Sequence, residues 1–489
     1  MRKYLVVLVA VLALVAFTAP PAGAAADIKA SGFYRAYAIL SNFHDGGGGP
    51  SLRTGNDGDA EQTNAYVAQR FRVKWQFGSE NVKATWYLES DVIWGDSAGN
   101  TNDGAGRNFG GALGADKVQT ETKQINVWFK IPDTSLETTV GIHTVRDSYS
   151  GVFGAANDAA GVTITGKFEP VSYKLVFAKL YENDTHHSDD GTLYQAEVNF
   201  APTKDSTLGL NFYVLQDDTG AAGDPAQARL QLNAFGNVND YKGLLYMPGI
   251  DGSIKVGPAK ISGWFLYQFG TYDAANGVGP TGTNQDLDVA GFAANLRGEM
   301  KVGPGKAFLE GLYISGDDNE NDTDFDSIIT LGDFQQNASP GGYSGYTKTH
   351  MVMMLSTWNM ASISQCVIGC SGGELGDSLS NSGRGIWHVA AGYSQKFTDM
   401  LSGEMNVGYV AATELYGFDK DGGRDNPMGT EINATVTAEI QKGLKISLTG
   451  AYAFLGDFMR DLPANPGVDP NMDAFEDAWT SYVRVNYTY

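Results

Sequence analysis

Hydrophobic and polar residues alternate with a period of two along most of this 489-residue chain, and no other feature constrains the fold as strongly. Over residues 66–77, Val67, Phe71, Val73, Trp75 and Phe77 fall on one face, and Tyr66, Arg70, Arg72, Lys74 and Gln76 fall on the other. The pattern returns over residues 431–440, where Ile, Ala and Val alternate with Glu, Asn and Thr. A period of two puts successive side chains on opposite faces of a strand. The sequence therefore predicts long amphipathic β-strands.

Short turns and long polar loops alternate between these strands. The short turns fall at residues 78–81, 132–135, 169–170, 202–206, 257–259, 303–305, 398–400 and 442–443. The long loops, rich in Gly, Asp and Asn, include residues 42–64, 95–122, 271–285, 317–384, 412–428 and 456–477. Eight turns join sixteen strands, and a first strand at 28–41 and a last one at 478–489 bring the total to eighteen. This layout predicts an all-β fold, a transmembrane antiparallel β-barrel with short periplasmic turns and long extracellular loops.

The sequence argues against three other classes: a helical membrane protein, a soluble β-sandwich and a nucleic-acid-binding protein. The only long apolar run, 4–17, is shorter than the roughly 20 residues that a membrane-spanning helix needs. A soluble β-sandwich also uses alternating strands, but eighteen long ones would make a sandwich too wide to fill. With 34 Lys and Arg against 56 Asp and Glu, the chain lacks the basic footprint of a nucleic-acid binder. An apolar segment at 350–358 has no partner strand in the count and is placed inside the 317–384 loop.

The first 24 residues have the layout of a secretory signal peptide. Arg2 and Lys3 precede an apolar stretch at 5–17, and Ala22-Gly23-Ala24 is a small-residue cleavage site. We therefore expect export, with residues 25–489 forming the barrel. Outside the cytoplasm, the only two cysteines, Cys366 and Cys370, are predicted to form a disulfide, because the sequence offers no further ligands for a zinc site.

The last strand carries a recognisable pattern. Val483, Val485, Tyr487 and the terminal Tyr489 occupy alternate positions, although Phe or Trp is the usual last residue. The strand resembles the C-terminal signature by which the assembly machinery recognises porins of Gram-negative bacteria. Short segments at 139–143, 161–164 and 313–318 resemble pieces of the alginate-export-like, eighteen-stranded porin family, although the Arg or Gln usual after Thr-Val-Gly is absent. The resemblance implies an outer-membrane channel embedded in lipid, and it supplies no substrate.

The polar faces are predicted to line an aqueous lumen, because side chains cannot fill a barrel of this size. Strand parity and height place four arginines (Arg35, Arg70, Arg72 and Arg484) together at mid-height of one wall, with Lys74 below them. Partial neutralisation of this wall by Glu89 and Asp91 of the third strand is the alternative to a free basic wall. The predicted pore-lining residues are Arg35, Arg70, Arg72, Lys74, Glu89, Asp91, Arg297, Glu299 and Arg484. These charges predict either a preference for anionic or mixed-charge solutes or simple solvation of the lumen.

Two further features concern the lumen. Inward positions of the later strands predict an acidic far wall, made of Glu197, Glu299, Glu310, Glu404, Glu431 and Glu439. The loop at 145–157, with Arg146 and Asp147, is a candidate constriction loop, and a plain surface loop is the alternative.

Carboxylates are dense over residues 317–326, and hard oxygen ligands of this kind suit Ca²⁺. The candidate ligands are Asp318, Glu320, Asp322, Asp324 and Asp326. The EF-hand spacing is not reproduced, and a solvated acidic loop tip is the alternative. No other cofactor is predicted.

No catalytic motif is present, so we expect no enzymatic activity. The sequence predicts passive diffusion of small hydrophilic, in one reading anionic, solutes. One alternative is a sheath around a cytochrome in an electron conduit, and another is a surface adhesin or receptor. Whether the barrel is a monomer or a trimer stays open.

Overall fold

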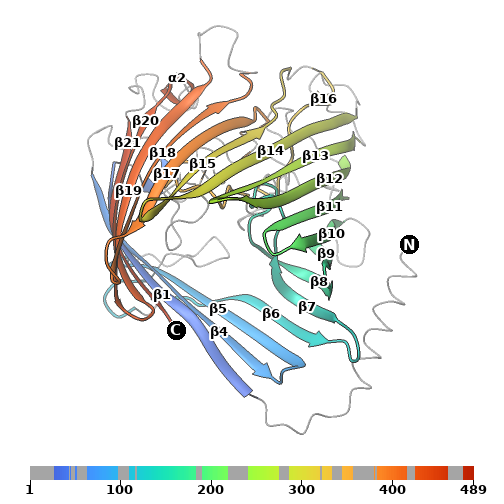
Figure 1. Cartoon of the computed structure of the whole chain (residues 1–489), viewed down its shortest axis with the longest axis horizontal. Coiled ribbons are helices and arrows are strands. Elements are labelled where there is room, and N and C mark those ends of the chain that lie inside the picture. The colour runs from blue at the N-terminus through green and yellow to red at the C-terminus, as the bar shows by residue number, and fades with distance from the viewer. Residues whose placement is uncertain are drawn as a thin grey trace.

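A computed structural model shows one antiparallel sheet closed into a barrel (Figure 1). The structure describes residues 27–42, 44–45, 50–51, 63–96, 110–115, 118–182, 190–218, 241–274, 286–319, 322–332, 344–355, 379, 381, 383–415, 425–460 and 477–489. The predicted signal peptide, together with Cys366 and Cys370, lies outside these residues.

The strands that form the barrel run in chain order around it. They are β1 (Asp27–Ser41), β4 (Asn64–Gly78), β5 (Val82–Ile93), β6 (Glu121–Lys130), β7 (Leu136–Val145), β8 (Asn157–Phe168), β9 (Val171–Glu182), β10 (Asp190–Thr203), β11 (Ser206–Asp217), β12 (Tyr241–Val256), β13 (Ala259–Ala274), β14 (Leu287–Val302), β15 (Gly305–Ile314), β17 (Ile386–Lys396), β18 (Leu401–Ala412), β19 (Pro427–Gln441), β20 (Leu444–Leu455) and β21 (Ala478–Thr488).

The smaller elements lie in connections. The two-residue strands β2 (His44–Asp45) and β3 (Pro50–Ser51) pair with each other, and β16 (Asp324–Phe325) runs parallel to β14. Of the nineteen strands in the large sheet, β16 only borders β14, so eighteen strands make the barrel. The single helix in the described residues, α2 (Asp457–Arg460), has four residues. No helix in this part of the chain is long and apolar enough to cross a membrane.

The barrel closes because β1 pairs with β4 on one side and with β21 on the other. The pairing with β21 runs from Phe33 opposite Thr488 to Ser41 opposite Thr480. Each of the eight predicted short turns joins two consecutive strands that pair with each other, at what we call the turn end. The longer connections share the opposite, loop end. The prediction of an eighteen-stranded barrel is confirmed.

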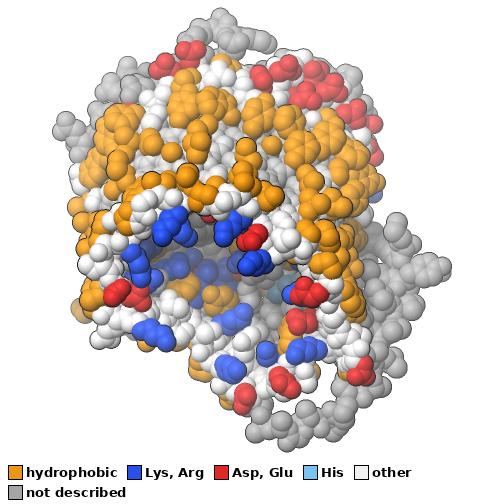
Figure 2. Space-filling view, in the orientation of Figure 1, with side chains coloured by type: hydrophobic (Ala, Val, Ile, Leu, Met, Phe, Trp, Pro, Cys, Tyr) orange, Lys and Arg blue, Asp and Glu red, His pale blue; other side chains and the backbone are white. Residues whose placement is uncertain are grey.

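Alternation along each strand separates the two faces of the wall. On β4, Phe71 is 38% exposed whereas Arg70 is 5% exposed, and on β14 Leu296 is 64% exposed whereas Arg297 is 6% exposed. Exposed apolar side chains cover much of the outer wall on the face that Figure 2 shows. A surface of this kind is stable in lipid and not in water.

The barrel interior is partly filled by connections from the loop end. Residues 146–156 and the described parts of the 317–384 loop contribute fully buried side chains to the same apolar cluster, including Tyr149, Phe153, Ile328 and Met353. The 317–384 loop is predicted as a long extracellular loop, without a prediction of whether it enters the pore. Its parts at 322–332 and 344–355 contact inward-facing side chains of the barrel wall, and their apolar residues are buried there. Residues 350–355 of the predicted apolar segment belong to this loop, and 356–358 lie outside the described residues.

Candidate functional site

Four arginines occupy neighbouring positions on the inner wall where the first and last strands meet. Arg35 on β1 lies opposite Arg70 on β4, and Tyr37 lies opposite Arg484 on β21. Arg72 lies opposite Phe33, two residues before Arg35 on β1. Figure 2 shows Lys and Arg side chains around and inside the opening of the barrel. The positive charges of the four arginines therefore face the same interior space.

Two of these arginines are neutralised by β5. The guanidinium of Arg70 donates two hydrogen bonds of 2.7 Å to the carboxylate of Asp91 and lies 3.1 Å from Glu89. Arg72 donates to the same Glu89. Because Arg70, Glu89 and Asp91 are all buried, their charges cancel locally and contribute little field in the lumen.

The other two arginines have neutral partners. The Nε of Arg35 donates to Asn486 Oδ1 at 2.8 Å, and the guanidinium stands 4.1 Å from the ring centre of Phe33. Arg484 donates to Ser447 Oγ at 3.2 Å. Among the described residues, no carboxylate lies within ion-pair distance of Arg35, Arg484 or Lys74. Arg35, Arg484 and Lys74, which are half-buried, therefore carry the net positive charge of this wall.

Arg297 and Glu299, also predicted to line the pore, lie on β14, away from the four arginines. Arg297 pairs with Glu299 at 2.8 Å and with Glu310 on β15, and it is 6% exposed. Its guanidinium also donates to the carbonyl of Lys348 at 3.2 Å. The loop segment 344–355 therefore covers this arginine, while the Glu299 side chain stays 45% exposed.

The predicted constriction loop folds around one buried carboxylate. Asp147 accepts hydrogen bonds of 2.8–2.9 Å from the backbone N–H groups of Tyr149, Gly151, Phe153 and Gly154. Burial raises the pKa of Asp147 to about 6, and these four donors act in the opposite direction. The neighbouring Arg146 side chain is exposed. The carboxylate of Asp147 thus accepts four backbone hydrogen bonds within the turn that brings the loop inward.

The tip of this loop rests on the far wall. Tyr149 packs 5.4 Å from Tyr213 and 5.6 Å from Trp264, measured between ring centres. Its hydroxyl lies over Gly249 of β12, where an added Cβ would come within 2.1 Å of it. The glycine leaves the space in which Tyr149 sits. At the base of the loop, Lys174 Nζ donates to the carbonyl of Arg146 at 3.2 Å.

The two inward segments are joined to each other by backbone hydrogen bonds. Leu331 N donates to Phe153 O at 2.7 Å, Gly345 N to Gly151 O at 3.0 Å, and Thr347 N to Ser150 O at 2.8 Å. The lumen is therefore narrowed by two connections. The contribution of 344–355 was not predicted from the sequence, although the apolar run at 350–358, which has no partner strand, is a usable signal.

The predicted acidic far wall needs correction. Glu310 and Glu431 are 2% and 0% exposed because residues 344–355 cover them, and Glu197 is bound to Lys174 at 2.7 Å. Glu299, Glu404 and Glu439 lie within 4 Å of Arg297, His350 and Lys445 respectively. Loop burial and local pairing, which parity alone does not show, therefore cover or pair five of these six carboxylates, whereas the partner of Glu404 is a histidine, which carries a charge only when protonated.

Local hydrogen bonds hold the described residues of the acidic segment. Asn319 donates to Asp322 at 2.7 Å, and the backbone of Asp324 donates to the same carboxylate at 3.1 Å. Asp317 is buried, and burial together with nearby Asp322, Asp326 and Asp318 raises its pKa to about 7. In the described part of the chain, no three His, Cys, Asp or Glu residues are placed to hold a metal ion. Glu320 lies outside the described residues, so the Ca²⁺ site stays a prediction.

Comparison with known proteins identifies the fold. No family model matches the chain, and no curated protein matches its sequence. The solved structure of OccK5 (OpdH) from Pseudomonas aeruginosa is 13% identical, with a TM-score of 0.52 over 94% of this chain and 98% of that chain. For OccK8 (OprE) of the same organism the values are 12%, 0.51, 95% and 98%. For the outer membrane protein opdK, also from that organism, they are 10%, 0.50, 95% and 98%.

Identities this low establish the fold and no more. The chain is a closed eighteen-stranded β-barrel of the kind found in the Gram-negative outer membrane, and the exposed apolar side chains of its outer face fit a lipid environment.

Proposed function

We propose that this protein is an outer-membrane porin that allows passive diffusion of small hydrophilic solutes and favours anions. The observation that carries the proposal is the pair of lumen arginines, Arg35 and Arg484, whose hydrogen-bond partners are neutral. A cation without a nearby counter-charge raises the local concentration of anions in a narrow aqueous passage.

The inward loops support a selective passage over an open conduit. Residues 146–156 and 344–355 meet inside the barrel, which brings any permeating solute close to the charged wall. A sheath around a cytochrome needs a lumen wide enough for a second protein, and these loops occupy part of that space. The adhesin alternative has no specific observation in its favour. No catalytic residue is assigned.

The proposed recognition by the assembly machinery rests on the sequence of the last strand, which in the folded barrel pairs with β1. Tyr489 exchanges backbone hydrogen bonds of 3.1 and 3.2 Å with Gly32, next to the seam where β1 meets β21. Its hydroxyl donates to the carbonyl of Arg72 at 3.2 Å. The resemblance to alginate-export-like porins stays a prediction and contributes no substrate.

Reversal potentials in a planar bilayer test the proposal. We expect the refolded protein to conduct by itself and to favour Cl⁻ over K⁺ in a KCl gradient. The double variant Arg35→Ser with Arg484→Ser should lower that ratio about twofold or more, because it removes two uncompensated charges.

The matched control is Arg35→Lys with Arg484→Lys, which keeps both charges at the same positions and should keep the selectivity. An unchanged ratio in the serine variant contradicts the anion preference. Absence of any channel conductance from the refolded wild type contradicts the porin assignment itself.

A further inference from the structure

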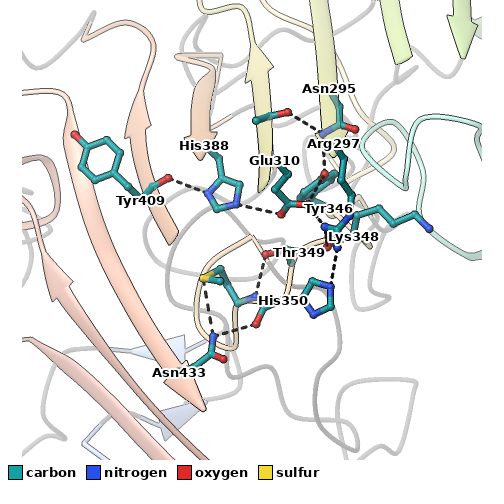
Figure 3. A network of polar contacts seen from close by, with 12 residues as sticks. Asn295, Arg297, Glu310, Tyr346, Lys348, Thr349, His350, His388, Tyr409 and Asn433 are labelled. Carbon is teal, nitrogen blue, oxygen red and sulfur yellow. Dashed lines mark hydrogen bonds and ion pairs between the residues drawn. The ribbon is translucent and has the colours of Figure 1, made fainter. Parts of the chain in front are cut away.

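A buried histidine and a buried glutamate face each other where the 344–355 segment meets the barrel wall (Figure 3). His388 on β17 and Glu310 on β15 both have side chains with 0% exposure, and His388 Nε2 lies 3.6 Å from Glu310 Oε1. Among the described residues, neither of these two atoms has a hydrogen-bond partner. A buried polar atom without a partner is costly, so this arrangement requires an explanation.

The other contacts of the pair define which proton is missing. His388 Nδ1 lies 2.9 Å from the carbonyl oxygen of Tyr409, and because a carbonyl only accepts, Nδ1 carries a hydrogen. In neutral imidazole, Nε2 then presents a lone pair to the carboxylate. Only a second proton on the ring turns the 3.6 Å contact into a hydrogen bond between opposite charges.

Glu310 also holds the inward segment. Its Oε2 accepts from the hydroxyl of Tyr346 at 3.2 Å and from Arg297. The Tyr346 hydroxyl accepts from Asn295 at 2.7 Å, and the Tyr346 side chain is fully buried. Figure 3 shows that these side chains and His388 converge on the one carboxylate. A change in the contacts of Glu310 Oε1 therefore affects the hydrogen bond by which the same carboxylate holds Tyr346 of the segment.

A second anchor lies on β19 and does not depend on this pair. Glu431 accepts the backbone N–H groups of Val352 at 2.6 Å and Met353 at 2.9 Å, and Asn433 donates to the carbonyl of His350 at 3.0 Å. Loosening at Glu310 therefore frees the segment on one side and keeps it tethered on the other.

The charged and titratable groups of the pair, of its contacts and of the segment that it holds come from several elements. They are Arg297 and Glu299 on β14, Glu310 on β15, Glu404 on β18, Glu431 on β19, and Tyr346, Lys348 and His350 of the segment. Both oxygens of Glu431 are occupied by backbone donors, and Arg297 keeps its charge at all relevant pH values. His350 Nε2 lies 3.1 Å from an Arg297 nitrogen that can only donate, so it serves there as an acceptor.

We propose that His388 and Glu310 share one proton, and that its loss at higher pH loosens residues 344–355 from the barrel wall and widens the passage. Without the proton, two lone pairs face each other in a site closed to water. Relief requires Glu310 to rotate or water to enter, and either change weakens the contact with Tyr346. With the proton bound, the pair closes and the segment is held. The widening rests on the proposed channel function, whereas the loosening does not.

Hydrogen exchange of the amides in 344–355, measured on the refolded full chain at pH 5 and pH 8, tests the loosening. His388→Gln supplies an amide donor to Glu310 at every pH and should stay protected. His388→Asn keeps a donor near Tyr409 but leaves Glu310 without one, and should exchange rapidly at every pH. Comparison of proteins at equal pH cancels the intrinsic chemistry of exchange. We expect wild type to match the Gln variant at pH 5 and to exchange about tenfold faster at pH 8.

Two controls locate the proton. His143→Gln changes an inward-facing histidine whose ring nitrogens contact Gly141 O and Thr163 Oγ1, and should leave the pH dependence intact. His350→Gln keeps an acceptor for Arg297 and should also leave it intact. A ratio of wild type to His388→Gln that does not change with pH overturns the proposal, as does loss of the pH dependence in His350→Gln.

Single-channel recordings at both pH values then test the widening. Wild type should show higher or noisier conductance at pH 8 than at pH 5, and His388→Gln should show no such difference. Exchange that follows the prediction in a protein without conductance supports the proton switch and contradicts only the porin assignment. A wild-type conductance that does not change while exchange does overturns the widening.

Discussion

The effect of a lumen arginine depends on whether a carboxylate lies next to it. Arg70 and Arg72 lie opposite acidic residues of β5 and are neutralised, whereas Arg35 and Arg484 face Asn486 and Ser447. An ion pair in a buried setting contributes mainly local structure, and a lone cation contributes a field that reaches into the passage. Selectivity should therefore follow the uncompensated charges.

Removal of the paired arginines gives a distinct prediction. In Arg70→Ser with Arg72→Ser, Glu89 and Asp91 lose their partners, so the selectivity shifts toward cations and the barrel loses about 3–5 kcal/mol of stability for each broken pair. Adding Glu89→Gln and Asp91→Asn should restore the wild-type reversal potential. If the fourfold variant stays shifted toward cations, Arg70 and Arg72 contribute to the field directly.

A second prediction at this scale concerns Asp317. Its carboxyl accepts the backbone N–H of Asp326 at 3.3 Å, and burial favours its protonated form in the folded loop. The folded loop therefore binds the proton more tightly than a released loop does. Its stability should be full below pH 3.8 and should fall as the pH rises to about 7. Hydrogen exchange of residues 315–326 checks this, and Asp317→Asn should remove the dependence.

At the scale of elements, the loops are placed by a few specific fits. Asp147 organises the turn at 146–156, and the space above Gly249 receives Tyr149. β16 covers the part of the β14 edge that extends beyond Ile314, the last residue of β15. These contacts explain why a polar, irregular connection has a defined position inside the barrel.

Gly249→Ala tests the fit of Tyr149. The new methyl group would collide with the hydroxyl, and an overpacked contact of this kind costs about 1–3 kcal/mol. We expect the loop to move and single-channel conductance to rise. Gly298→Ala is the matched control, because a Cβ there meets no atom within 4 Å. Equal conductance in the two variants contradicts the role of Tyr149 in narrowing the passage.

At the scale of the whole molecule, the barrel and its contents are separable. The wall is a continuous ladder from β1 to β21, and its outer face needs only lipid. The loops use polar groups of the inner face, such as Gln268, which is bonded at 2.7 and 2.9 Å to the backbone of Ile329. Strand pairing should therefore survive loss of the inner segment.

Replacing residues 344–355 with a Gly/Ser linker tests this separation. We expect a barrel that still resists SDS at room temperature and unfolds on heating, with a conductance larger than that of wild type. Failure to form an SDS-resistant barrel would show that the segment is needed for closure.

Much of the wall could be predicted from the sequence, because each strand residue faces either lipid or the lumen and a period of two records which. The strand count, the eight turns and the gathering of Arg35, Arg70 and Arg484 all depend on that local rule. The acidic wall was predicted from the same rule and needed correction at Glu310 and Glu431, because a loop distant in sequence covers them.

The sequence by itself determined the barrel, its two faces and the position of the basic wall, since pairing between consecutive strands fixes parity and height along the chain. Only the tertiary structure decided which charges are neutralised, how two loops meet inside the lumen, and that His388 faces Glu310. The physical reason is that these contacts join segments whose separation in sequence carries no periodic signal. They depend on shape, burial and hydrogen-bond partners that exist only once the barrel has closed.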